Sequence, residues 1–315
     1  MKWLALIKRG FGPKPLIKID KYNIAILELT TAGIIWGASF TLVRFALVDF
    51  SASTLLFWRL LFAFVAGELI HYFTNKKLFF ESFSDAKLSL WAGVFLGLSL
   101  ISQTYGLNFT TATNSGFITS LYVVLIPLLG AMFFGHKVKL HHVLLSLLAF
   151  AGMGFLLNLK ELQMARGELL TLMAAFTAAL QIIIVGRRAM HAKSAFRFNT
   201  YQTFWSLVAI LPFLIVEVKV KSLSLWPENV SLRSVLAMLS LAVFVSLFAF
   251  YLQIRAQRIL STTTSSMLCL LEGPFAFFFA AIFLSEALNG WQFFGAFIIL
   301  LSCFLSIVID RPKNS

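Results

Sequence analysis

Long apolar stretches separated by short polar ones follow one another along the chain from about residue 24 to residue 309. A helix needs about 20 mainly apolar residues to cross the hydrocarbon core of a bilayer. Ten stretches meet this requirement, and the polar segments between them are too short to form a soluble domain. The pattern therefore predicts ten transmembrane helices, at 24–46, 52–73, 88–108, 114–134, 142–158, 167–186, 198–217, 234–253, 261–284 and 288–309.

The composition supports a membrane protein. Of the 315 residues, 59% are hydrophobic and only 12% are charged, and the mean hydropathy is +0.88. A soluble domain is typically about half apolar and about a quarter charged. A larger core does not explain the difference, because the buried fraction grows slowly with chain length. We expect an all-α integral membrane protein whose site is built by the helices themselves.

The charges indicate how the helices are oriented. The formal net charge is +13, which would fit a nucleic-acid partner if the basic residues formed one patch. They lie instead in short clusters between the apolar stretches, and we expect no nucleic-acid partner. With residues 1–23 as a cytoplasmic tail and ten spans, 19 Lys and Arg residues fall inside and 6 outside. Because basic residues are enriched in cytoplasmic loops, this bias predicts that both termini are cytoplasmic.

The chain also resembles itself after a shift of 150 residues. The shift brings Gln103 onto Gln253, Thr113 onto Thr263 and Ser115 onto Ser265 without a gap. It divides the helices into two sets of five, at 24–158 and 167–309. Because five is an odd number, the two sets cross the membrane in opposite directions, and inverted repeats of this kind are typical of secondary transporters.

Several segments resemble a known family. They include "IIWGASFTLVRFAL" from residue 34, "QTYGLNFTTATNSGFITSLYVVLIPLL" from residue 103 and "YLQIRAQRILSTTTSSMLCLLEGPFAFFFAAIFLSEAL" from residue 251. Their order and spacing resemble the drug/metabolite transporter superfamily and, within it, the EamA-type transporters. Gly273 departs from the family pattern, because it separates Glu272 from Pro274 where the family usually has Glu-Pro.

The resemblance implies a carrier of the bacterial cytoplasmic membrane. Such a carrier moves small organic solutes by alternating access, usually outward, and needs no cofactor. Its fold is compatible with a monomer or a homodimer. The solutes of the family range over amino acids, other metabolites and drugs, so the resemblance does not choose among them.

Glu272 is the first candidate for the transport path. It lies about 11 residues into the stretch 261–284, near the bilayer midplane. A charged side chain at that depth costs about 2.5–3.5 kcal/mol on insertion scales and commonly has a function. The carboxyl group suits proton coupling or a hydrogen bond to a solute amine. The alternative is a protonated structural acid that holds its helix to a neighbour.

Other polar residues also fall inside the predicted helices. Buried amides and hydroxyls in membrane helices more often link helices than bind a ligand, so each has that alternative role. Arg59, in the second helix, has the alternatives of a structural anchor or a partner for an acid. The remaining candidates for solute contact or coupling are Trp36, Ser39, Gln103, Asn114, Gln181 and Gln253.

Three classes of function fit a helical membrane protein. We expect a secondary transporter, with protons as candidate coupling ions. A membrane enzyme would need clustered acids, bases or metal ligands, and the sequence has no HExxH, GxSxG or GxxxxGK[ST] motif. A scaffold without transport activity would need neither the internal repeat nor an acid at the midplane. We therefore predict no catalytic and no metal-binding residue.

Overall fold

The computed structural model describes residues 20–135, 139–156, 166–220, 222, 224–286 and 289–310, and every regular element in these ranges is a helix. In the first half of the chain the helices are α2 (Lys21–Ala46), α3 (Ala52–Thr74), α4 (Lys76–Glu81), α5 (Asp85–Gly106), α6 (Ala112–Thr119), α7 (Tyr122–Phe134) and α8 (Leu140–Leu156). In the second half they are α9 (Arg166–Arg188), η1 (Ala189–His191), α10 (Ala195–Val220), α11 (Leu232–Ser240), η2 (Leu241–Ala249), α12 (Phe250–Gln257), α13 (Thr262–Cys269), α14 (Glu272–Leu284) and α15 (Gly290–Asp310).

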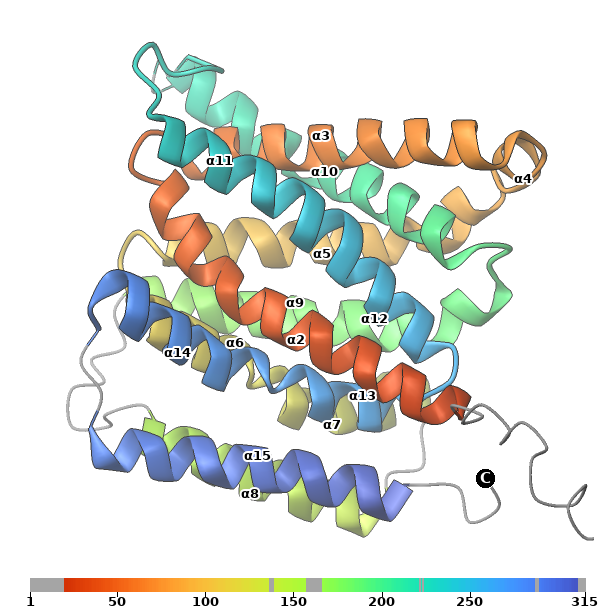
Figure 1. The fold of residues 1–315 in the computed structure, drawn as a ribbon, viewed down its shortest axis with the longest axis vertical. Coiled ribbons are helices and arrows are strands. Elements are labelled where there is room, and N and C mark those ends of the chain that lie inside the picture. The colour runs from red at the N-terminus through yellow and green to blue at the C-terminus, as the bar shows by residue number, and fades with distance from the viewer. Residues whose placement is uncertain are drawn as a thin grey trace, which may run out of the picture.

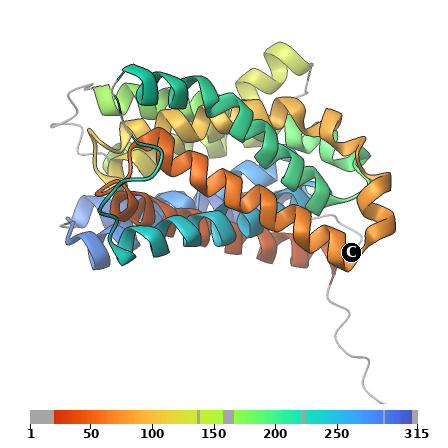
Figure 2. The ribbon, with the colours of Figure 1, turned by 90° about the horizontal axis from the view of Figure 1, so that it is seen from above.

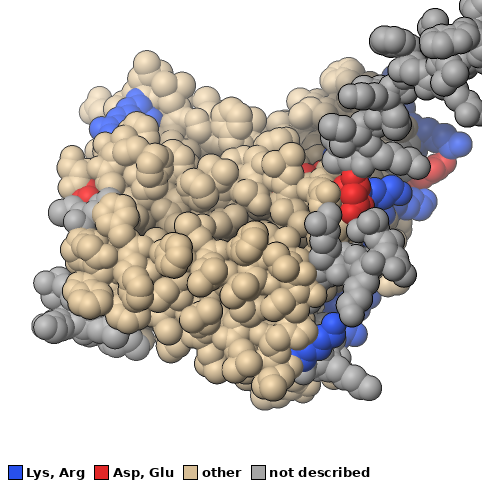
Figure 3. All heavy atoms as spheres, turned by 60° about the horizontal axis from the view of Figure 1, so that its bottom comes forward, with Lys and Arg blue, Asp and Glu red and all other residues tan. Residues whose placement is uncertain are grey.

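Within the described residues, helices lie along all ten predicted stretches, which confirms the all-α membrane fold. Within the described ranges, nine helical spans are long and apolar enough to cross a membrane, and α8 is a shorter apolar helix. Charged side chains gather toward the two ends of the helices, with an apolar surface between them (Figure 3). This is the surface that a bilayer requires, because its hydrocarbon core offers no partners for charged groups.

Polar side chains fix where several helices begin. Asp20, Ser51, Thr111, Ser231 and Ser261 each accept a hydrogen bond from a backbone N–H of the first turn that follows. Such caps satisfy donors that have no partner inside the helix. They explain why the helices start close to the boundaries that the apolar pattern predicts.

The helices pack side by side in an arrangement that mixes the two halves of the chain (Figures 1 and 2). α5 packs against α9 and α10, and α2 packs against α14 and against the span formed by α11, η2 and α12. α8 and α15 pair with each other along one edge of the molecule (Figure 1). The middle of the molecule is therefore built by helices from both repeats.

Two predicted helices are interrupted at equivalent points. The stretch 114–134 is divided into α6 and α7, and the stretch 261–284 is divided into α13 and α14. All four helix boundaries are related by a shift of 150 residues, since Ala112 corresponds to Thr262 and Tyr122 to Glu272. Each break is a two-residue turn at 120–121 or 270–271, so the repeat seen in the sequence is also a repeat of backbone geometry.

The structure also has features that the apolar pattern does not predict. α4 is a short helix between α3 and α5, and η2 is π-helical over nine residues in the middle of its span. A π-helical segment leaves the normal hydrogen-bonding pattern and frequently occurs at functional sites. Val245 of this segment lines a cavity between the helices.

Close contact between helices depends on glycine at a few points. A Cβ atom built on Gly37 of α2 would lie 2.4 Å from the Cβ of Phe275 in α14. On Gly93 of α5 it would lie 2.5 Å from the backbone oxygen of Gln202 in α10. Both distances are far shorter than a van der Waals contact. The absence of a side chain at these positions lets the backbones approach, as is common between membrane helices.

Candidate functional site

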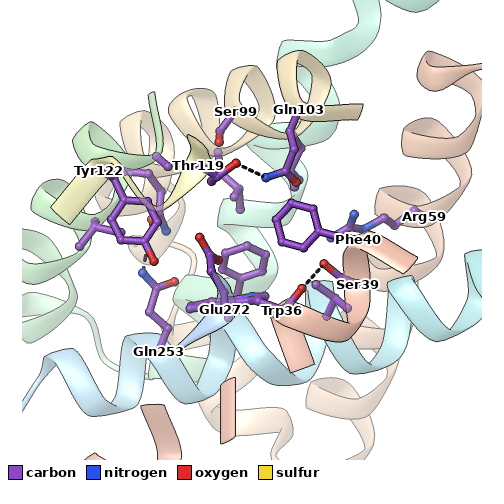
Figure 4. A pocket seen from close by; sticks show the side chains of 17 residues that line it. Trp36, Ser39, Phe40, Arg59, Ser99, Gln103, Thr119, Tyr122, Gln253 and Glu272 are labelled. Carbon is purple, nitrogen blue, oxygen red and sulfur yellow. Dashed lines mark hydrogen bonds between the residues drawn. The ribbon is translucent and has the colours of Figure 1, made fainter. Parts of the chain in front are cut away.

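A cavity lies in the middle of the molecule, between helices of the two repeats (Figure 4). The space between its walls is about 580 Å³, part of which is open to solvent. Seven of the eight side chains chosen from the sequence line it: Trp36, Ser39, Arg59, Gln103, Gln181, Gln253 and Glu272. The sequence-based choice thus identifies residues that the fold brings together, and their role in binding stays a prediction.

Asn114 lies elsewhere. It lines a shallow pocket at one end of the helices, together with Arg44 and Glu168. The reason is its position in α6, which begins only two residues earlier at Ala112. A residue in the first turn of a membrane-spanning helix lies near the membrane surface, not at its middle.

The two helix breaks position the acid of the cavity. Glu272 is the first residue of α14, and Tyr122 is the first residue of α7. Both line the cavity and both are buried. Apart from their interaction with each other, the Tyr122 hydroxyl and Glu272 Oε1 have no hydrogen-bond partner among the described residues. The carboxyl group therefore keeps hydrogen-bonding capacity for a molecule in the cavity.

The backbone around Glu272 has an irregular pattern of hydrogen bonds. Gly273 N–H donates to the carbonyl oxygen of Leu270 over 3.1 Å, and Phe275 N–H donates to that of Leu271 over 3.1 Å. Pro274 has no N–H to donate. The break at 270–271 thus lies just before Gly273 and Pro274.

Arg59 enters the cavity from α3 and is 2% exposed. Its Nε donates to Ser246 Oγ in η2 over 2.8 Å. No acid pairs with Arg59 within the residues that the structure describes. Of the alternatives that the sequence left open, an acid partner is therefore absent from this arrangement. A buried cation without a counter-ion is costly, and a bound anion would offset that cost.

The π-helical segment that holds Ser246 is supported by a side chain that sequence reasoning missed. Asn199 of α10 is fully buried and its Nδ2 donates to the carbonyl oxygens of Ser246 and Leu247, over 3.1 and 2.9 Å. These carbonyl groups belong to the segment whose helical hydrogen bonds are shifted. Asn199 thus holds the partner of Arg59 in place. Its amide in the apolar stretch 198–217 was the available signal.

A chain of three amides begins at another wall of the cavity, which Gln253 and Gln181 line. Gln253 Nε2 donates to Gln181 Oε1 over 3.3 Å, and Gln181 Nε2 donates to Gln202 Oε1 over 3.1 Å. Gln253 Oε1 is buried and has no partner in the described part of the chain. Gln181 thus bonds to side chains of two other helices, whereas Gln253 keeps one acceptor that is unpaired within the described residues.

The repeat counterpart of Gln253 takes part in a different contact. Gln103 Nε2 donates to the hydroxyl of Thr119 over 2.9 Å, which joins α5 to the end of α6. Both glutamines nevertheless line the cavity. The two glutamines that correspond in the sequence repeat therefore also line the same cavity.

Aromatic rings form the apolar part of the wall. The Trp36 and Phe250 ring centroids are 5.3 Å apart, with planes inclined by 50°. Trp36 Nε1 is buried and has no hydrogen-bond partner in the described ranges. Ser39 Oγ donates to the carbonyl oxygen of Trp36 over 2.7 Å, which is a local bond inside α2. Trp36 thus offers a ring face and a free donor, while Ser39 is already engaged.

Ion pairs and hydrogen bonds join the two repeats at both ends of the helices. The Arg255 guanidinium pairs with Glu28, which joins α12 to α2. At the other end, Glu286 accepts from the backbone N–H groups of Ala112 and Thr113, over 3.1 and 3.3 Å, and from the Thr113 hydroxyl. Glu286 belongs to the second repeat and α6 to the first, so this contact holds the repeats together.

Comparison with known proteins identifies the family. The model of the EamA-like transporter family matches residues 23–158 and 165–308. The chain belongs to the EamA-like transporter family. An uncharacterized transporter from Archaeoglobus fulgidus is 31% identical over 281 residues, which is 88% of this chain and 84% of that protein. A solved crystal structure that covers 91% of this chain and 99% of its own has a TM-score of 0.71 at 16% identity, and it supports the fold alone.

This EamA-like protein is therefore a membrane transporter. The family match covers both repeats, and the fold has the membrane-spanning helices that a transporter needs. A small solute and the lipid bilayer follow as its partners. The cavity lined by Arg59 and Glu272 is the candidate site for that solute.

Proposed function

We propose that this transporter is a secondary exporter of small zwitterionic organic solutes, coupled to protons. The observation that carries the proposal is the presence of Arg59 and Glu272 in one buried cavity. Arg59 has no acid partner in the described residues, and Glu272 has free hydrogen-bonding capacity. The two groups would bind a solute carboxylate and a solute amine.

The other walls fit an organic group of moderate size. Trp36 and Phe250 supply ring faces for an apolar portion of the solute, and the Gln253 amide oxygen supplies an acceptor. Small-molecule sites are typically apolar clefts with a few polar groups that fix orientation. The combination favours an organic molecule over an inorganic ion.

The mechanism that we propose is alternating access by rocking of the halves 24–158 and 167–309 around the cavity. Broken helices at the interface between repeats are typical of carriers that work this way. The turns at 120–121 and 270–271 are candidate hinges, because each interrupts a span next to the cavity. Release of the Glu286 contact with α6 would open one end.

The membrane and the orientation are proposals from the charge pattern. The bias of 19 to 6 basic residues favours cytoplasmic termini, with residues 1–23 as a tail in the cytoplasm of a bacterial cell. Glu272 would take up a proton when the cavity faces one side and lose it when the cavity faces the other. One chain supplies all walls of the cavity, so a homodimer would carry two separate paths.

A comparison of cells with and without the protein tests the function. A solute that accumulates inside only the cells that lack the protein would support export. That solute would then be measured in proteoliposomes containing the purified protein, with and without a pH gradient. Uptake only in cells that carry the protein would overturn export. No transport of any accumulated solute would favour the enzyme or scaffold alternatives.

A further inference from the structure

A hollow lined by cations lies outside the central cavity, between α5 and α9. Its walls include Trp91 of α5 and Ile184, Arg187 and Arg188 of α9, and the space within it is about 600 Å³, part of it open to the surroundings. None of these residues belongs to the transport cavity. The hollow lies where α9 ends, at the membrane end where Asp85 begins α5.

The apolar part of the hollow continues into the bilayer region. Trp91 is 58% exposed, although it is a large apolar residue. One turn further along the same helix, Phe95 lies with its ring centroid 6.3 Å from that of Trp91. Tryptophan is enriched where a membrane helix meets the lipid headgroups. The two rings form an apolar surface that extends from the headgroup level toward the hydrocarbon core.

The charged part of the hollow favours an anion. Arg187 and Arg188 are adjacent and exposed, and Lys87 lies one helical turn before Trp91. Arg188 makes no ion pair among the described residues. Four described acids at this end interact with groups outside the hollow: Glu28 with Arg255, Glu68 with Arg197, Glu81 with Lys77, and Asp85 with the backbone N–H groups of Lys193 and Ser194.

We propose that this hollow is a binding site for an anionic phospholipid. The two arginines bind the headgroup phosphate, because the guanidinium fork matches phosphate oxygens. Trp91 contacts the glycerol region, and one acyl chain runs along Phe95 and Ile184. Basic pockets between membrane helices are known to take anionic headgroups. The lipid would bridge α5 and α9, which belong to different repeats and both line the transport cavity.

Native mass spectrometry of the purified protein tests this site. The probes are phosphatidylglycerol and phosphatidylcholine with the same acyl chains. We expect the wild-type protein to retain phosphatidylglycerol preferentially. The double variant Arg187→Gln/Arg188→Gln should bind it roughly thirtyfold more weakly, from the usual contribution of basic residues at an anionic surface. Trp91→Ala should weaken retention severalfold without changing the preference between headgroups.

The matched control is Lys77→Gln/Lys76→Gln, which removes two charges from α4 at the same membrane end. An equal loss in this control would overturn the site, because it would indicate a general attraction to the surface. Equal retention of the two lipids by the wild-type protein would also overturn it. Displacement of phosphatidylglycerol by inorganic phosphate at the same concentration would assign the hollow to a soluble anion and overturn the lipid.

Discussion

Tyr122 and Glu272 occupy the same position in the two repeats and line the same cavity. They are 150 residues apart, and each is the first residue of a helix that follows a two-residue turn. The repeat thus places two polar side chains at one level of the molecule, and only the second repeat supplies a carboxylate. Among the described residues that line the cavity, Glu272 is the one carboxylic acid, and a phenol takes its place in the first repeat.

The first prediction concerns this acid. Glu272→Gln keeps the shape of the side chain and cannot take up or release a proton. We expect transport in proteoliposomes to lose its dependence on the pH gradient and to slow by at least tenfold. Tenfold is a lower bound, because a positioned acid–base group in an enzyme is commonly worth about 10²-fold or more.

The matched control for Glu272 is Tyr122→Phe, which removes the neighbouring hydroxyl and keeps the carboxyl group. It should change the rate and preserve the response to the pH gradient. A Glu272→Gln protein that transports at the wild-type rate with the wild-type pH dependence would limit Glu272 to a structural role.

The second prediction separates a binding role of Arg59 from a structural one. Arg59→Met removes a buried cation that has one hydrogen bond and no acid partner. Because the desolvation of that cation is not offset by an ion pair, we expect the thermal unfolding temperature to stay the same or rise. Transport of a solute that carries a carboxylate should be lost.

Arg59→Lys is the conservative companion variant. It keeps the charge and loses the planar fork of the guanidinium, so we expect partial transport with a raised KM. If Arg59→Met unfolded at a much lower temperature, Arg59 would be a structural anchor. A contact with the solute would then not be needed to explain the loss of transport.

How much of this arrangement is predictable from the sequence depends on the range of the contacts. The helix positions follow from local apolar length, and the seven cavity residues were chosen as polar or tryptophan side chains inside those stretches. Asn114 met the same criterion and lies outside the cavity, because its helix starts only two residues before it. The helix breaks are not visible in the apolar pattern, since the residues at 120–121 and 270–271 are compatible with a continuous helix.

Contacts between segments that lie far apart in the chain could not be predicted from the sequence. Arg197 has the pattern of an ordinary basic residue near a helix end, yet it is fully buried. Its guanidinium carbon lies 4.7 Å from the centroid of the Phe79 ring, and Ser82 and Glu68 accept from its nitrogens. These partner residues lie more than 100 positions earlier in the chain. No local sequence pattern connects them to Arg197.

The third prediction follows from this enclosure of Arg197. Arg197→Met would leave Glu68 without its ion pair and would remove the hydrogen bond from Arg197 to Ser82. Removing one partner of a buried pair typically costs about 3–5 kcal/mol, and we expect about 3 kcal/mol here because Glu68 is partly exposed. Chemical unfolding in detergent measures the loss. Lys77→Met, which breaks an exposed pair with Glu81, should cost less than about 1 kcal/mol, and equal losses would contradict the prediction.

The fourth prediction concerns the contact between α2 and α14. In Gly37→Ala the new Cβ would come 2.4 Å from Phe275 Cβ and 2.7 Å from the Phe275 carbonyl carbon. The backbones must separate, and overpacking of this kind costs about 1–3 kcal/mol. We expect lower thermal stability and slower transport, since Trp36 and Glu272 lie beside this contact. Gly290→Ala, where no atom lies within 4 Å of the added Cβ, should be neutral, and a neutral Gly37→Ala would refute the close packing.

The last prediction concerns pH and the contact between two loops. Asp49 accepts from the backbone N–H of Ser231 over 3.0 Å and from its hydroxyl over 2.5 Å. These hydrogen bonds lower the pKa of Asp49 below its ordinary value of 3.8. Because the pKa is lower in the folded protein, the contribution to stability is complete above that value and is lost as the pH falls through the folded pKa.

The difference in unfolding temperature between the wild-type protein and Asp49→Asn isolates this contribution, since the other groups titrate in both proteins. It should stay constant from about pH 7 down to about pH 5, and it should shrink as the pH falls below 3.8. Ser231→Ala removes the hydroxyl donor and should reduce the pH-dependent part of the difference. A difference that grows on acidification would have the wrong sign for a carboxylate stabilised by hydrogen bonds, and would show that Asp49 does not stabilise the start of α11 through its charged form.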